Sequence, residues 1–496
     1  MRRHDDLDPT RSDLGSGGPP PRCGMDRAMS ASSKGCLFKG GAVITVDPEL
    51  GVMPCADVRI RNGAIDAVGR DLEGDDPEVI DATGMIVMPG LVDTHCHMWS
   101  TVGRNFTADD GFGYYPAKWA TAHLYSPEDF HASVLLGFAE LANGGVTTVH
   151  NWSHNSRSSA HVDAELCAHE ALPLRARYSL GHIEGLAPDT LNLFPDLPRI
   201  QNEWFSPSGR LNGLVSLGLN LRGMVQSEAA VFHQEMEMAL RAGLPVSIHA
   251  TQSRPNLDDA ANYERRGYLG PNFLFCHYVA ASQSDRDAMA RTGTPLSFAT
   301  LSEMRLGHDG DPRRAFLNMR AAGVLISLSS DAASIAPMNM LEAMRVTWNM
   351  AVPHDDDEPR ATEPLSFAET IEMATLNGAK ALGLGAVTGS LTPGKRADVI
   401  MINTNEVNIA PAAHPNTTVV QSATPANVDT VMVDGRILKR GGKLVGIDVE
   451  AIVAAAKGSA LRIRSAVGGA LAPRCSCGAF IRSGSGASPA PSPIPN

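Results

Sequence analysis

The sequence predicts an α/β protein: a (β/α)8 barrel of the TIM type that carries a small composite β-sandwich domain built from both ends of the chain. Two observations predict this fold. Between residues 86 and 385, apolar runs of strand length alternate with helical periods, as in barrels of parallel strands covered by helices. On both sides of this stretch the chain is rich in strand-like patterns. A doubly wound sheet is the competing fold, but no Gly-x-Gly-x-x-Gly follows the first strand and no Walker-type loop occurs.

The barrel strands are expected where the apolar runs lie. We place them at residues 86–97, 146–151, 174–181, 213–219, 245–249, 272–277, 295–299 and 324–331. Helical periods fit between them. One helix should begin with Ser126 as its N-cap and Pro127 at its first position, and continue to Leu141.

The β-rich ends predict one sheet domain assembled from distant segments. Residues 56–68 alternate around Asn62-Gly63, which is a strong hairpin signal, and residues 428–438 alternate around Asp434-Gly435. The expected organisation is a disordered leader (1–34), an amino-terminal β-sandwich segment (35–85), the barrel (86–385), a carboxyl-terminal β-sandwich segment (386–447), a C-terminal helix (448–466) and a disordered tail (467–496).

Composition excludes several classes of partner. The 496 residues carry a formal net charge of −12, and an acidic surface repels phosphate backbones, so we expect no nucleic-acid partner. No run of 18 apolar residues occurs, so we expect no membrane partner. The amino-terminal segment lacks the apolar core of a secretory signal, and the eight cysteines form no short-spaced framework. These features predict a cytoplasmic protein.

Polar residues with metal-binding side chains stand at the carboxyl ends of four predicted strands. His95 and His97 share one face of the first strand, because side chains alternate along a strand. His249, His277 and Asp331 end the fifth, sixth and eighth strands. Active sites of such barrels form at these strand ends, so the set predicts a metal centre of imidazoles and a carboxylate. That donor set suits zinc or iron, whereas magnesium prefers oxygen ligands.

These residues and two flanking motifs resemble the amidohydrolase superfamily, and within it the cytosine deaminase and triazine chlorohydrolase branch. The resemblance spans about residues 36–447 and includes Val-Met-Pro-Gly-Leu-Val-Asp-Thr-His-Cys-His at 87–97 and Gly-Ser-Leu-Thr-Pro-Gly-Lys-Arg-Ala-Asp-Val-Ile at 389–400. It implies that one divalent metal, zinc before iron, is bound by His95, His97, His249 and Asp331. The resemblance also implies that His277 lies beside the metal-bound water and that Asp331 is the general base. A homodimer is consistent with the resemblance.

The expected number of metal ions follows from the absence of lysine in most of the barrel. Two-metal members of the superfamily bridge their ions with a carboxylated lysine on a middle strand. Here no lysine occurs between Lys118 and Lys380, so a lysine-bridged pair is impossible and one ion per chain is expected.

The predicted function is metal-dependent hydrolysis of a carbon–nitrogen bond, other than a peptide bond, in a small cyclic or amide-like substrate. A divalent ion supplies the nucleophile by lowering the pKa of water from 15.7 to roughly 7. One alternative is a deaminase or dehalogenase of an N-heteroaromatic ring of the pyrimidine, purine or triazine type. A second alternative is an inert barrel that only binds a ligand.

One position departs from the deaminases of this branch. They carry His-x-x-Glu on the fifth strand, and that glutamate protonates the ring nitrogen under attack. This chain has His249-Ala-Thr-Gln252, and an amide cannot shuttle a proton. We therefore expect Gln252 to bind substrate but not to act as an acid, with Glu303, His308 or His277 as candidates for that role.

Further substrate-facing residues are expected around the mouth of the barrel. Trp99 belongs to an aromatic-rich loop at 98–125, His150 and His154 are expected to follow the second strand, and His182 the third. Arg222 follows the fourth strand. The full set of predicted substrate-binding residues is Gln252, Trp99, His150, His154, His182 and Glu303. Histidines 123, 131, 161, 169 and 233 fall in predicted helices and are expected to be solvated.

Overall fold

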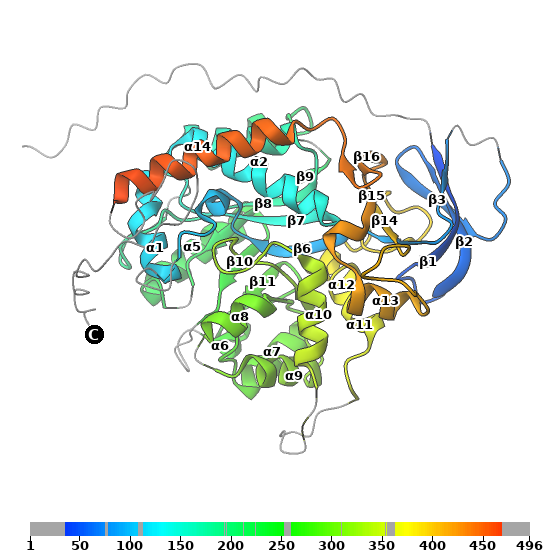
Figure 1. The fold of residues 1–496 in the computed structure, drawn as a ribbon. Helices are drawn as coiled ribbons and strands as arrows, with labels where there is room; N and C mark the ends of the chain where they lie inside the picture. Colours follow the sequence, from blue (N-terminus) through cyan, green and yellow to red (C-terminus); the bar gives the residue numbers. More distant parts are fainter. Residues whose placement is uncertain are drawn as a thin grey trace, which may run out of the picture.

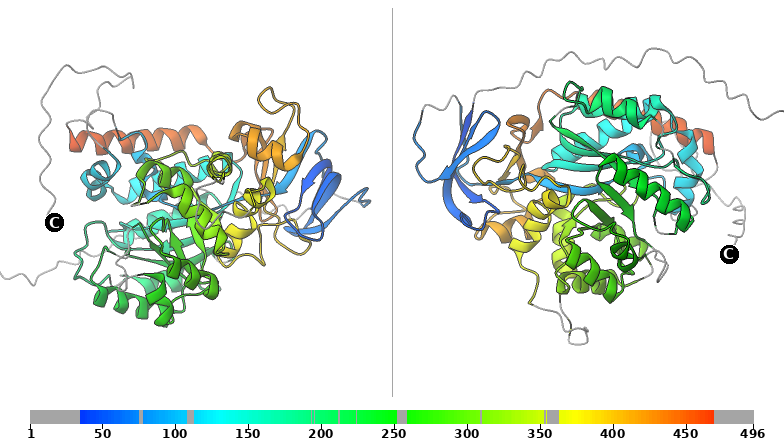
Figure 2. Two further views of the ribbon diagram at one scale, coloured as in Figure 1. Left: turned by 90° about the horizontal axis from the view of Figure 1, so that it is seen from below. Right: turned by 180° about the vertical axis from the view of Figure 1, so that it is seen from behind.

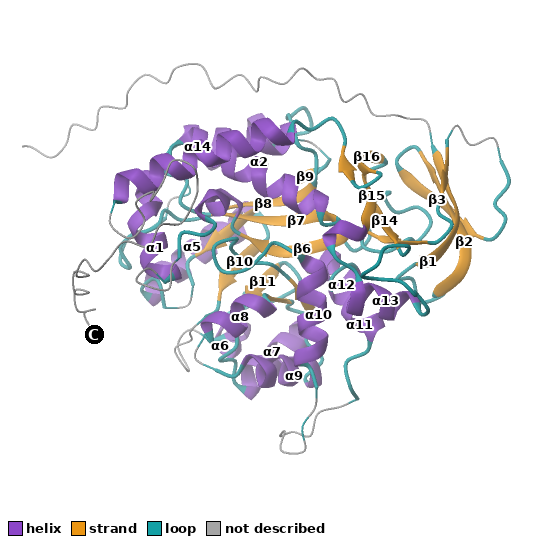
Figure 3. Ribbon diagram, in the orientation of Figure 1, coloured by secondary structure: helices purple, strands orange, loops and turns teal. Residues whose placement is uncertain are grey.

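In a computed structural model, eight parallel strands form a barrel enclosed by helices (Figures 1 and 3). The structure describes residues 35–468 except 75–77, 108–112, 193, 195, 212, 224, 252–258, 309, 353 and 355–362. The expected leader and most of the expected tail therefore lie outside the described residues, as does Gln252. The barrel strands are β6 (Leu91–Cys96), β7 (Val146–Ser153), β8 (Arg175–Leu180), β9 (Val215–Leu221), β10 (Val246–His249), β11 (Phe273–Cys276), β12 (Leu296–Phe298) and β13 (Ile326–Leu328).

The barrel closes through the backbone that follows its last strand. Strands β6 to β13 pair in chain order, and an isolated parallel bridge joins Cys96 to Asp331. The Asp331 amide donates to the His95 carbonyl at 2.9 Å, and the His97 amide donates to the Asp331 carbonyl at 3.2 Å. The predicted barrel is thus confirmed, and the seam that closes it contains three of the predicted metal ligands.

Helices surround the strands and begin where the sequence provides caps. In α2 (Pro127–Asn143), the Ser126 hydroxyl accepts the Asp129 amide and the Asp129 carboxylate accepts the Ser126 amide, as the predicted N-cap requires. The other helices around the barrel are α3 (Ser159–Ala171), α4 (Leu197–Trp204), α5 (Ala229–Ala242), α6 (Ala260–Arg265), α7 (Gln283–Thr292), α8 (Thr300–Leu306), α9 (Pro312–Ala321), α10 (Met340–Met350), α11 (Phe367–Met373) and α12 (Leu376–Ala381).

The β domain is a separate nine-stranded sheet at one side of the barrel, built from both ends of the chain (Figure 2). Its path runs β17-β16-β15-β14-β5-β1-β2-β3, and β4 pairs with β1. The strands are β1 (Cys36–Ile44), β2 (Val52–Arg61), β3 (Ala64–Gly69), β4 (Val79–Asp81), β5 (Met85–Pro89), β14 (Val399–Asn403), β15 (Val428–Val433), β16 (Arg436–Arg440) and β17 (Lys443–Leu444). Helix α13 (Pro415–Ser422) lies between β14 and β15 in the sequence.

The run expected as one strand over 86–97 is two strands in different sheets. Strand β5 pairs with β1 and β14 in the β domain, whereas β6 opens the barrel. Gly90 separates them, and a Cβ built on it would lie 2.1 Å from the Thr147 hydroxyl oxygen. Only glycine allows this close approach, so the chain passes from one sheet to the other at this residue.

A buried ion cluster joins the two domains. Arg175, at the start of β8, contacts both carboxylate oxygens of Asp398 at 2.6 and 3.1 Å, and one oxygen of Asp434 at 3.0 Å. Both the Arg175 and Asp398 side chains are almost fully buried. This bidentate pair connects the first residue of β8 to the residue directly before β14.

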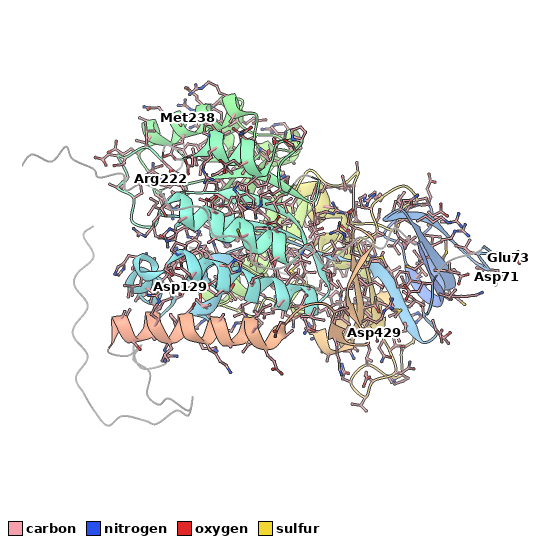
Figure 4. The ribbon with its side chains drawn as sticks, turned by 90° about the horizontal axis from the view of Figure 1, so that it is seen from above. Asp71, Glu73, Asp129, Arg222, Met238 and Asp429 are labelled. Carbon is pink, nitrogen blue, oxygen red and sulfur yellow. The ribbon has the colours of Figure 1, made fainter. Side chains whose placement is uncertain are left out.

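The C-terminal helix α14 (Val449–Val467) runs along α2 (Figures 1 and 4). Ile463 and Ala456 are buried in a cluster with Phe130 and Trp99, which lie next to the site described below. Arg462 forms an ion pair with Asp129, at the start of α2. No helix among the described residues is long and apolar enough to span a membrane.

Candidate metal centre

The five residues singled out at the strand ends lie together. His95 is on β6, His249 ends β10, and His97, His277 and Asp331 follow β6, β11 and β13 closely. The Nε2 atom of His249 is 3.3 Å from Nε2 of His95 and 3.2 Å from Nε2 of His97. The Asp331 Oδ1 atom is 3.4 Å and 3.3 Å from the same two nitrogens.

These separations fit a metal ion. A tetrahedral zinc ion with ligands at 2.0–2.1 Å has ligand atoms about 3.3–3.4 Å apart, and four of the six pairs among these four side chains have a spacing of 3.2–3.4 Å. Three Nε2 atoms face one another and a carboxylate, and the opposite Nδ1 atoms of His95 and His97 are buried without a hydrogen-bond partner in the described part of the chain. The convergence of lone-pair-bearing atoms on one point is what a bound cation explains.

The electrostatics of the cluster favour the protonation states that bind metal. Burial lowers the pKa of His95, and lowers the pKa of His97 and His249 further, so the three imidazoles are neutral. Burial opposes ionisation of Asp331, but the adjacent His95 and His97 hold the pKa of its carboxyl well below its usual range. Neutral imidazoles with a carboxylate form the ligand set that a divalent ion requires.

Asp331 is held by its backbone and by a serine. Its φ of +62° lies in the left-handed region, which a non-glycine residue adopts only when its surroundings impose it. The Ser302 hydroxyl donates to Oδ2 at 2.5 Å, so Oδ1 is left to face the histidines. Asp93 lies on β6 with His95 but does not join the cluster, because its carboxylate accepts hydrogen bonds from Ser330 and from the His95 amide.

His277 stands beside the cluster, with its ring centroid 5.1 Å from that of His95 and 5.4 Å from that of His249. Its φ is +79°. Its Nδ1 atom lies 2.9 Å from Oε1 of Glu303. Burial opposes protonation of the ring, but the Glu303 carboxylate raises the pKa of His277 to about 9.

A pocket opens beside His97. It is lined by His97, Trp99, Tyr114, Lys118, Tyr125 and His154, among others. The Trp99 indole donates to Nδ1 of His154 at 3.1 Å, and the opposite nitrogen of that ring contacts Glu184 at 2.7 Å. Lys118 of α1 (Tyr114–Thr121) forms an ion pair with the same Glu184 carboxylate at 2.5 Å.

Three predicted substrate-facing residues occupy other places than expected. His150 lies within β7 and not after it, and its ring nitrogens contact the Thr94 carbonyl and the Ser179 hydroxyl, both at 2.9 Å. Glu303 is fully buried behind His277. Arg222 is also buried, in an ion pair with Glu235 of α5.

The remaining predicted positions stay near the mouth. His182 is buried with its ring centroid 5.6 Å from that of His154. The expectation that helix histidines are solvated is wrong for His161 and His169, which are buried against barrel and helix neighbours. Sequence reasoning missed Ser302 and Lys118, since a single serine or lysine in a loop or helix carries no pattern.

Comparison with protein families identifies the chain. Residues 86–438 match the model of the Amidohydrolase family. This chain belongs to the amidohydrolase family. The matched stretch includes the whole barrel with the strand-end residues, and it extends into the β domain.

Relatives of this amidohydrolase are similar over most of their length. A 5′-deoxyadenosine deaminase of Methanothermobacter thermautotrophicus is 27% identical, over 85% of this chain and 99% of its own. A 5-methylthioadenosine/S-adenosylhomocysteine deaminase of Desulforudis audaxviator is 28% identical, over 83% and 95%.

Among solved structures, an adenosine deaminase of Xanthomonas campestris with bound zinc has a TM-score of 0.74 at 21% identity, covering 87% of this chain and 98% of its own. A zinc complex of atrazine chlorohydrolase from Arthrobacter aurescens has a TM-score of 0.73 at 21% identity, covering 86% and 99%. These likenesses confirm the barrel with its β domain. With the family match, the relatives identify this amidohydrolase as a metal-dependent hydrolase of carbon–nitrogen bonds in small molecules, as predicted, rather than an inert barrel.

Proposed function

We propose that this amidohydrolase binds one zinc ion through His95, His97, His249 and Asp331 and hydrolyses an exocyclic carbon–nitrogen bond of an N-heteroaromatic substrate of the adenosine type. The observation that carries the proposal is the separation of 3.2–3.4 Å in four of the six pairs formed by the four ligand atoms. The deaminases that resemble this chain over most of its length support the choice of substrate.

The residues divide the chemistry between them. A divalent ion in this site lowers the pKa of water to about 7 and so supplies hydroxide at neutral pH. Asp331 accepts the proton of the attacking water and delivers it to the departing amine, which leaves as ammonia. His277 faces the attacking oxygen with its Nε2 atom while Glu303 holds Nδ1. The pocket beside His97 receives the planar ring.

A single ion is supported by the donor set and by the composition of the barrel. Three imidazoles and one carboxylate suit zinc, and the stretch between Lys118 and Lys380 has no lysine to bridge a second ion. Elemental analysis of the purified protein tests this directly. We expect close to one zinc per chain, and a reproducible value of two tightly bound ions would contradict the proposal.

The reaction is tested by ammonia release. The zinc-loaded protein is incubated with adenosine, 5′-deoxyadenosine, 5-methylthioadenosine and an aminotriazine, and ammonia is measured together with the change in ultraviolet absorbance of the ring. We expect turnover of at least one adenosine-type substrate, abolished in a His95→Ala, His97→Ala double variant. Absence of ammonia from the whole panel with zinc bound would contradict the proposed substrate class.

Gln252 favours a second candidate. Attack on an aromatic ring carbon disrupts its aromaticity, and an acid at the ring nitrogen offsets that cost; Gln252 offers no such proton. An amide or lactam carbonyl needs only polarisation and proton transfer by Asp331. Lactams and hydantoins therefore belong in the same panel, and turnover confined to them would replace the adenosine-type proposal.

A further inference from the structure

We propose that Glu303 is a positioning residue that fixes the ring orientation of His277 and keeps a proton on its Nδ1 atom, an inference that rests on the proposed function. Glu303 lies in the first turn of α8 and is fully buried. Its Oε1 atom is 2.9 Å from Nδ1 of His277 and 3.2 Å from the Ala299 amide. Within the described ranges its ion-pair partners are imidazoles, not arginine or lysine. Burying a carboxylate in this way is costly, so its place against an imidazole calls for a functional reason.

The contact keeps a proton on Nδ1 of His277. A carboxylate oxygen accepts hydrogen bonds, so Nδ1 of His277 donates to Oε1 of Glu303. The same ring places a nitrogen within 4.8 Å of ring nitrogens of His95 and His249. Without Glu303, the ring could rotate, and its contact with the attacking oxygen would be lost.

The backbone hydrogen bonds around His277 do not fix the orientation of its ring. His277 has φ +79° and Tyr278 has φ +48°, two successive left-handed residues after a short strand. Their amides are tied to the Ser297 and Ala250 carbonyls at 3.0 and 3.1 Å, which fixes the main chain but not the ring. The ring is therefore oriented by its side-chain contacts.

His308 occupies the other side of the same carboxylate. Its Nε2 atom is 3.4 Å from Oε2 of Glu303, and its ring centroid is 4.8 Å from that of His277. Glu303 thus lies between two imidazoles, one directed at the cluster and one at the end of α8. The Ala299 amide, which donates to Oε1 at 3.2 Å, holds the carboxylate beside Nδ1 of His277.

The experiment combines kinetics with a readout that does not need turnover. In protein labelled with ¹⁵N-histidine, a proton on Nδ1 bonded to a carboxylate gives a downfield resonance, which is assigned by its loss in His277→Gln. We expect Glu303→Gln to shift or remove that resonance while leaving one zinc per chain. We also expect kcat to fall about 10- to 100-fold with KM nearly unchanged, the scale seen when a partner of a metal-site histidine is removed.

A double-mutant cycle separates positioning from general stability. In a His277→Ala background, Glu303→Gln should change kcat by less than about twofold, because the group on which it acts is gone. Met304→Ala, at an exposed position of the same helix, is the matched control and should match the unmodified protein. If Glu303→Gln folds poorly, Glu303→Asp keeps the charge but shortens the reach, and should show the same resonance loss.

The outcomes distinguish this inference from the proposed function. An active unmodified protein whose kcat and Nδ1 resonance are both unaffected by Glu303→Gln would overturn the role of Glu303 alone. A protein that turns over nothing in the panel would overturn the proposed function, while the resonance would still report whether Glu303 holds the Nδ1 proton of His277.

Discussion

Replacing Asp331 with Asn tests the centre of the proposed chemistry. Asn keeps the shape of the side chain and one oxygen that can face His95 and His97, and its amide can still meet the Ser302 hydroxyl in place of Oδ2. What it loses is the capacity to accept a proton. Removal of a general base costs about 10²- to 10⁴-fold in rate, which corresponds to roughly 2.7–5.4 kcal/mol of transition-state stabilisation.

The assay measures kcat at saturating substrate together with zinc content in the same preparation. We expect Asp331→Asn to lose at least about a hundredfold in kcat, beyond any fractional loss of zinc. Ser302→Ala serves as the graded comparison, since it removes only the hydrogen bond that orients Oδ2, and its kcat should fall between those of the unmodified protein and Asp331→Asn. A fully zinc-loaded Asp331→Asn that retains more than a tenth of the activity would show that the general base is another group.

Three other perturbations have outcomes that follow from the same sequence and structure. Gln252→Glu should raise activity on aminoheterocycles relative to lactams, measured as the ratio of kcat/KM values; an unchanged ratio would show that the acid lies elsewhere. Arg175→Met should lower the free energy of unfolding, measured in urea, by about 3–5 kcal/mol, because it leaves the buried Asp398 charge unpaired. Adding Asp398→Asn should recover part of this loss. Burial raises the pKa of Glu165 to about 7 from 4.5, so its stabilising contribution is complete below pH 4.5 and is lost as the pH rises through 7. Glu165→Gln should therefore raise the urea midpoint at pH 8 more than at pH 5, and equal shifts would refute the raised pKa.

The sequence predicts the barrel and the grouping of its strand-end histidines and aspartate well because both depend on local pattern. Apolar runs of strand length give the strands, and parallel strands in a barrel bring their carboxyl ends to one face. His95, His249 and Asp331 could therefore be placed together without knowing a single distance. The same logic gave the helix start at Ser126, where the capping residues are adjacent in sequence.

Other features depend on contacts between distant residues and leave little trace in the sequence. The break at Gly90 follows from the nearby Thr147 side chain, so the apolar run across it looks continuous. The sequence does not show that the His150 ring, within β7, contacts the Thr94 carbonyl and the Ser179 hydroxyl. It also does not show that the Glu303 side chain, expected at the substrate, contacts Nδ1 of His277.

Three of the proposed metal ligands also close the barrel, and this would couple ion binding to the stability of the fold around them. The amide of Asp331 and the amide of His97 make two backbone hydrogen bonds that join the end of β6 to the chain after β13. An ion held by the side chains of the same residues binds the closed seam and not an opened one, so it stabilises the seam by RT ln(1 + [Zn]/Kd), about 4.1 kcal/mol at a thousandfold excess over Kd. Hydrogen exchange of these two amides should therefore slow by up to about 10³-fold on zinc loading, if exchange requires the seam to open. The Ala176 amide, which bonds the Leu214 carbonyl between β8 and β9 on another side of the barrel, is the internal control and should change far less. Equal protection of all three amides with and without zinc would show that the ion and the seam are independent.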